Sequence, residues 1–155
     1  MNVVETIISG GQTGVDMAAL EFAIQNGLRY KGFCPRGRIN ESGIIPQKFN
    51  LIETISFDHK TRTRYNILSA GGTLMLYNAK LDGGTEYTRR FCLSVNHPLL
   101  VLTLQNTYSE NINKLNNWIE THNITLMNIA GPRESEENNY QKVKQFLLEW
   151  WKYVL

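Results

Sequence analysis

Short apolar runs alternate with longer amphipathic stretches along the whole chain, as in α/β proteins. The apolar runs predict strands over residues 6–9, 30–34, 73–77, 98–104 and 124–130. Helical spacing predicts helices over residues 15–25, 58–69, 85–95 and 108–122, and a last helix with the stripe Val143, Phe146, Leu147, Trp150, Trp151 and Val154. This order predicts a Rossmann-like, doubly wound α/β fold, with a mostly parallel sheet of about five or more strands and helices on both faces. The almost wholly apolar strand 98–104 is expected at the centre of that sheet.

Length and composition limit the class of protein. The 155 residues suit a single Rossmann-like domain over residues 1–155. No apolar run approaches the roughly 20 residues that span a bilayer, and the first residues do not form a secretory signal, so we expect a cytoplasmic protein without a membrane partner. A net charge of +2 gives no reason to expect nucleic acid. The two cysteines, Cys34 and Cys92, form no CxxC pair and predict neither a disulfide framework nor a zinc site.

A glycine-rich turn, ISGGQTGVD, joins the first predicted strand to the first helix. Backbone amides at such a turn, with the helix dipole behind them, favour a bound phosphate. The spacing matches neither G-x-G-x-x-G nor a P-loop. The expected ligand contacts are Gly10, Gly11, Gln12, Thr13 and Gly14. Alternatively, the glycines only shape a tight turn, and Thr13 and Asp16 form a capping box that stabilises the helix. For Asp16 itself we expect this capping role, because a carboxylate that points into a phosphate site would repel the ligand.

Three further loops are expected at the same edge of the sheet, because all parallel strands end there. They contribute Arg36 and Arg38 after the second strand, Gly83, Gly84 and Thr85 after the third, and Arg133 after the fifth. Arginine binds phosphate through paired hydrogen bonds, and a glycine turn before a helix offers free amides. Each arginine has an alternative role: Arg36 and Arg38 as solvated side chains, and Arg133 as a local partner of Glu134 or Glu136.

Candidate catalytic groups are sparse. His59, His97 and His122 are scattered, and no metal-ligand or Ser-His-Asp spacing occurs. The end of the second strand lacks the acidic residue that usually binds the ribose of NAD, which argues against a nicotinamide dehydrogenase. The residues therefore predict neither a metal site nor catalytic residues, and they favour a binding protein over an enzyme.

Six segments resemble, in order, the family named "putative molybdenum carrier": ISGGQTGVD, CPRGR, RTRYNI, GGTLML, LDGGTEYT and NIAGPRES. The resemblance implies a Rossmann-type fold related to lysine-decarboxylase-like proteins and cytokinin-activating nucleotide hydrolases. It implies a homo-oligomer, a dimer or tetramer, that carries the molybdenum cofactor, a pterin with a phosphate. The two glycine turns would then contact the phosphate, supported by Arg36, Arg38 and Arg133.

The related hydrolases show a pattern P-G-G-x-G-T-x-x-E whose glutamate serves catalysis. In this chain Thr88 stands at the glutamate position, and Glu86 is displaced by two residues, which turns it about 200 degrees around a helix. We therefore expect a protein that binds a phosphorylated small molecule, the molybdenum cofactor or a nucleotide, and requires no cofactor of its own. The alternatives are a phosphoribohydrolase of nucleoside monophosphates that uses Glu86 or Asp16, and a nucleotide-signal sensor that acts through oligomerisation.

Overall fold

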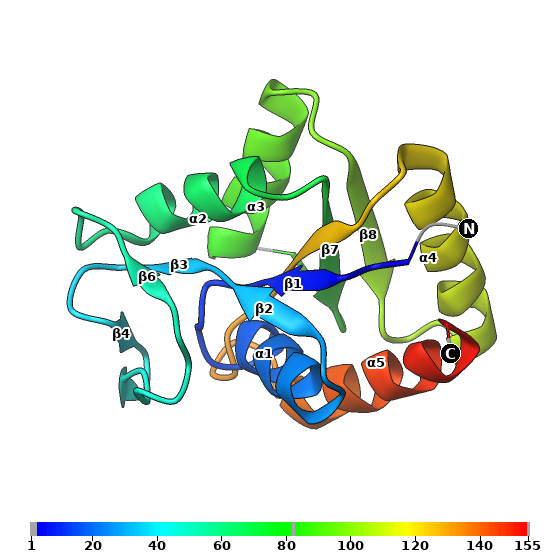
Figure 1. The fold of residues 1–155 in the computed structure, drawn as a ribbon, viewed down its shortest axis with the longest axis horizontal. Coiled ribbons are helices and arrows are strands. Elements are labelled where there is room, and N and C mark those ends of the chain that lie inside the picture. Colours follow the sequence, from blue (N-terminus) through cyan, green and yellow to red (C-terminus); the bar gives the residue numbers. More distant parts are fainter. Residues whose placement is uncertain (1–2, 82, 155) are drawn as a thin grey trace.

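The computed structural model describes residues 3–81 and 83–154 and contains a parallel five-stranded sheet in the order β2-β1-β9-β7-β8 (Figure 1). Its strands are β1 (Thr6–Ile8), β2 (Arg29–Lys31), β7 (Gly72–Tyr77), β8 (Leu99–Thr103) and β9 (Leu126–Ala130). β9 lies between β1 and β7, with Thr6 opposite Leu126 and Thr73 opposite Asn128. The predicted Rossmann-like α/β fold is confirmed.

Helices cover both faces of the sheet. They are α1 (Val15–Gln25), α2 (His59–Leu68), α3 (Gly83–Ser94), α4 (Tyr108–His122) and α5 (Tyr140–Val154). α1 and α5 pack together on one face, and α2 and α3 lie on the other (Figure 1). α2 begins where the Asp58 carboxylate accepts a hydrogen bond from the Thr61 N–H, and α4 begins where the Thr107 hydroxyl accepts one from the Glu110 N–H. None of the helices in the described residues is long and apolar enough to cross a membrane.

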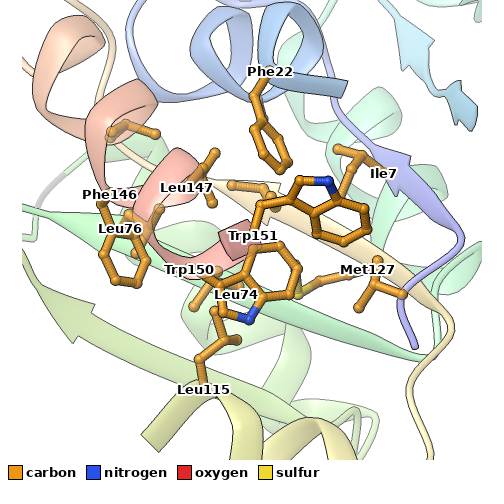
Figure 2. Packing of buried hydrophobic residues seen from close by; sticks show 14 of the residues in the cluster. Ile7, Phe22, Leu74, Leu76, Leu115, Met127, Phe146, Leu147, Trp150 and Trp151 are labelled. Carbon is orange, nitrogen blue, oxygen red and sulfur yellow. The ribbon is translucent and has the colours of Figure 1, made fainter. Parts of the chain in front are cut away.

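The larger hydrophobic core fills the space between the sheet and helices α1, α4 and α5 (Figure 2). The predicted apolar stripe of the last helix provides its centre, because Trp150 is fully buried and contacts the rings of Phe22 and Trp151. The Trp150 indole donates a hydrogen bond of 2.9 Å to Asn116 Oδ1, which satisfies its polar atom inside the core. This packing holds α1 against the face of the sheet, and it thereby fixes the turn before α1 at the carboxyl end of the strands.

The strand 98–104 was expected at the sheet's centre, and this prediction is wrong. β8 is an edge strand, paired only with β7 among the described strands, and four of its five residues are only half-buried. β9 takes the central position instead. An apolar strand therefore does not identify a central strand, because helices that pack over an edge strand also favour apolar side chains there.

The predicted strand 30–34 is divided at Gly32. β2 ends at Lys31, and β3 (Phe33–Cys34) leaves the main sheet to pair with β6 (Ile52–Glu53). A side chain at Gly32 would place its Cβ 1.8 Å from the Ser9 carbonyl oxygen, so the chain can cross there only as glycine. The long loop that follows contains a small antiparallel hairpin of β4 (Ile39–Asn40) and β5 (Gly43–Ile44).

Candidate functional site

A cavity of about 230 Å³ lies at the carboxyl ends of the strands, below the first turns of α2 and α3. It forms beside β9, the central strand. From β1 the chain continues outward to β2 on one side of β9, and from β7 it continues outward to β8 on the other side. Ligands of doubly wound sheets bind where the direction of the strand order changes in this way. The principal lining residues are Gly10, Gln12, Asp16, His59, Arg62, Asn66, Gly83, Gly84, Thr85, Asn128, Gly131 and Arg133. Loops that are distant in sequence therefore converge here.

A buried ion pair lies in this cavity. Arg62 Nη1 is 3.4 Å from Asp16 Oδ2, and each side chain is only 10% exposed. The same carboxylate oxygen accepts a hydrogen bond of 3.2 Å from the Gln12 N–H. Burial raises the pKa of Asp16 to about 6, against the opposing positive charges of Arg62 and Arg133. The site thus combines a carboxylate that is hard to ionise with two guanidinium groups.

Most amides of the glycine turn already have partners within the protein. The Gly11 N–H donates to Ser9 Oγ, the Gln12 N–H to Asp16, and the Thr13 N–H to Gln12 Oε1. The Asp16 carboxylate thus occupies a place that the sequence suggested for a phosphate. Of the five turn residues expected to contact the ligand, Gly10 and Gln12 line the cavity.

The other three turn residues lie outside the cavity lining and hold neighbouring segments. A Cβ on Gly14 would be 2.7 Å from the Pro132 carbonyl oxygen, and one on Gly11 would be 2.7 Å from the Leu51 side chain. The Thr13 hydroxyl donates to the Glu41 carboxylate and accepts a hydrogen bond from the Glu134 N–H. These contacts fix the β4–β5 hairpin and the loop after β9 around the turn.

The capping box expected from Thr13 and Asp16 is not formed. Gly14 is the N-cap of α1, and no side chain caps this end. The Asp16 carboxylate instead faces back to the Gln12 N–H and across to Arg62. Asp16 is therefore a cavity residue, and the capping role predicted for it is wrong.

Arg36 and Arg38 do not reach the cavity. The Arg38 guanidinium donates hydrogen bonds of 2.7 to 3.4 Å to the backbone carbonyls of Ile45, Pro46, Phe49 and Leu51. Arg36 is exposed, with its guanidinium carbon 5.3 Å from the centre of the Phe57 ring. Arg38 thus shapes the long loop. The sequence led us to expect both arginines at the ligand site, but neither lines the cavity.

The second glycine turn and Arg133 do reach the cavity. Gly83, Gly84 and Thr85 form the first turn of α3, where backbone amides have no partner within the helix. Asp82, in the LDGGT segment before them, lies outside the described residues. Arg133 also lines the cavity, with its Nε 3.5 Å from Glu136 Oε1. An anion in the cavity would meet both groups.

Neither of the two positions compared with the hydrolase glutamate, Glu86 and Thr88, places a carboxylate in the cavity. Glu86 does not line the cavity and is bound by Arg89 and Arg90 on the surface of α3. Thr88 does line it, and its hydroxyl donates a 3.1 Å hydrogen bond to the Gly84 carbonyl. Asp16 is thus the buried carboxylate that the described part of the cavity supplies.

Sequence reasoning missed the contribution of α2. Arg62 and Asn66 are buried one turn apart, beside Ile67. A signal was present: a helix on a doubly wound sheet must bury one face, and the face of this polar helix that includes Ile67 also carries Asn66 and Arg62. Within residues 3–81 and 83–154, no group of three or more His, Cys, Asp or Glu side chains is placed to hold a metal ion.

The parallel sheet and the cavity at its switch point define a Rossmann-like α/β protein with a candidate small-molecule site. Residues 7–151 match the circularly permutated YpsA SLOG family, and the chain belongs to this family. It is also similar to the crystal structure, at 1.45 Å resolution, of a "putative molybdenum carrier protein" from Syntrophus aciditrophicus SB. The TM-score is 0.94 with 36% identity over 96% of each chain, which confirms the resemblance found in the sequence. No curated protein matched the chain.

Proposed function

We propose that this protein binds a phosphorylated small molecule in the cavity, with a phosphorylated pterin such as the molybdenum cofactor, or a nucleotide, as its ligand. The observation that carries the proposal is the convergence of Arg62, Arg133 and the first turn of α3 on one cavity. Two guanidinium groups and a helix N-terminus provide the charge and the hydrogen-bond donors that a phosphate requires. The similar crystal structure is named a "putative molybdenum carrier protein", which supports the molybdenum cofactor among these ligands.

Binding assays with matched arginine variants test this proposal. The full chain would be titrated by calorimetry with phosphorylated pterins, AMP, GMP, sulfate and molybdate. Replacing Arg133 by Gln should weaken binding of the phosphorylated ligands about 10- to 100-fold, the usual effect of losing a charged hydrogen bond. Arg36→Gln is the matched control, because this arginine is exposed and lies outside the cavity. Equal affinities for wild type and Arg133→Gln, or no binding of any ligand, would contradict the proposal.

A phosphoribohydrolase is the second candidate, and one observation favours it. Asp16 is a buried carboxylate whose pKa burial raises to about 6, inside a cavity with two arginines, and such groups often serve in catalysis. Incubation with nucleoside monophosphates, followed by chromatography for released base, tests this activity. Asp16→Asn should abolish release, whereas Glu86→Gln should not, because Glu86 lies outside the cavity. If wild type releases no base, the hydrolase candidate fails.

A further inference from the structure

The Asp16 carboxylate poses a problem for an anionic ligand. It lines the cavity and is 7% exposed as a residue, and both hydrogen bonds that it accepts from described residues end on Oδ2. A sulfate or molybdate ion offers only acceptor oxygens, so its negative charge would face an ionised carboxylate across a small cavity. The Arg62 guanidinium already pairs with Asp16, so its positive charge would be divided between this carboxylate and the bound anion and would not fully compensate both.

A ligand that carries hydrogen-bond donors beside its phosphate resolves this conflict. An ionised carboxylate accepts hydrogen bonds on both oxygens, and Oδ1 of Asp16 accepts none from the described residues. A hydroxyl or N–H group of the ligand could therefore bind Oδ1, while the phosphate binds Arg133 and the start of α3. The carboxylate would then attract one part of the ligand instead of repelling all of it.

We propose that Asp16 makes the cavity selective for phosphomonoesters that carry O–H or N–H donors in addition to the phosphate, and that it selects against bare oxyanions. This inference rests on the proposed function and specifies its ligand class. Two kinds of donor fit the chemistry. One is the hydroxyl groups of a ribose, and the other is the paired N–H groups at the 2-amino-6-oxo edge of guanine or the equivalent 2-amino-4-oxo edge of a pterin.

The surrounding charges determine how this selection depends on pH. Arg62 and His59 of α2, and Arg133 of the loop after β9, act on the cavity, which Lys60 and Glu136 also line. Burial, followed by the charges of Arg62 and Arg133, lowers the pKa of His59, which keeps it neutral near pH 8. At that pH the carboxylate of Asp16 is ionised, because its pKa is about 6, and near pH 5 it is protonated.

Calorimetry at pH 8 with sulfate and GMP tests the inference on the full chain. Asp16→Asn should bind sulfate about tenfold more tightly, because the opposing charge is gone. The same variant should bind GMP about tenfold or more weakly, because a charged acceptor is lost. The wild-type protein would also be titrated with 2′-deoxy-GMP and with IMP. A loss of affinity of similar size with 2′-deoxy-GMP assigns the donor to the ribose, and one with IMP assigns it to the 2-amino group. Opposite shifts for sulfate and GMP are the signature of selection, whereas shifts in the same direction, or none, overturn it.

A second measurement covers the case in which Asp16→Asn does not fold. Sulfate does not titrate between pH 5 and 8, so any change of its affinity with pH, for a cavity that keeps Asp16, comes from the protein alone. In a His59→Gln background, which removes the nearby histidine, sulfate binding should tighten about tenfold or more from pH 8 to pH 5. A constant affinity overturns the inference and leaves phosphate binding intact. If neither sulfate, nor GMP, nor a phosphorylated pterin binds at any pH, the proposed function itself fails.

Discussion

The ionisation of Asp16 should leave a measurable mark on the stability of the protein. Burial raises its pKa from the ordinary value of 3.8 to about 6 in the folded state. The folded protein therefore holds this proton more tightly than the unfolded chain does. The resulting stability is fully present below the unfolded-state pKa and is lost as the pH rises through 6.

The size of the effect follows from the two pKa values. Between pH 8 and pH 5, protonation of Asp16 should add about 1.4 kcal/mol to the free energy of unfolding. Two histidines act in the opposite direction, because burial lowers the pKa of both His59 and His97. Acidification through their unfolded-state pKa therefore removes stability, and the wild-type profile alone does not isolate Asp16.

A comparison with Asp16→Asn removes these other contributions. The variant leaves Arg62 without its carboxylate, which should lower stability at every pH, but Arg62 does not titrate in this range. Urea denaturation followed by tryptophan fluorescence gives both free energies. The difference, wild type minus variant, should increase by about 1.4 kcal/mol from pH 8 to pH 5. A difference that stays constant, or decreases as expected for a carboxylate with a lowered pKa, would refute the reasoning.

Three further predictions concern the framework of the site. Arg38→Ala should lower the free energy of unfolding by about 3 kcal/mol in chemical denaturation, because four backbone carbonyls lose a charged donor; Arg36→Ala should change it by less than about 0.5 kcal/mol. Gly131→Ala should destabilise the protein by about 3 kcal/mol in the same assay, since the new Cβ would lie 2.2 Å from the Leu76 carbonyl oxygen. Both cysteines are buried, and burial raises the pKa of Cys92 to about 11, so a thiol reagent should label Cys34 and Cys92 only after denaturation; rapid labelling of native protein would contradict this.

Local pattern was sufficient for most elements of the fold but not for their arrangement. The predicted helices 15–25 and 108–122 coincide with α1 and α4, because their spacing and end signals lie within the segments themselves. The position of β8 depends on which strand pairs with β7, and hydropathy carries no information about that choice. The break at Gly32 was also hidden, since it arises from contact with Ser9, which lies far away in the sequence.

The candidate site was predictable at its edge of the sheet and less so in its residues. The glycine turn and the GGT turn were recognised as loops that meet at one end of the parallel strands, and both contribute to the cavity. Closeness to a strand end did not bring Arg38 to the site, because backbone carbonyls of its own loop bind it. Arg62 comes instead from a helix, and its partnership with Asp16 depends on how α2 packs against the sheet.

The central place of β9 has a consequence for how the chain folds. β1 pairs with β2, and β7 pairs with β8, so each half of the sheet can form from nearby segments. The two halves are joined only through β9 in the described sheet, and Thr6 pairs with Leu126 across most of the chain. During synthesis the ribosome must therefore release β9 before the sheet can close. Until then the nascent protein exposes the inner edges of both halves, which makes this the stage at which aggregation competes most strongly with folding.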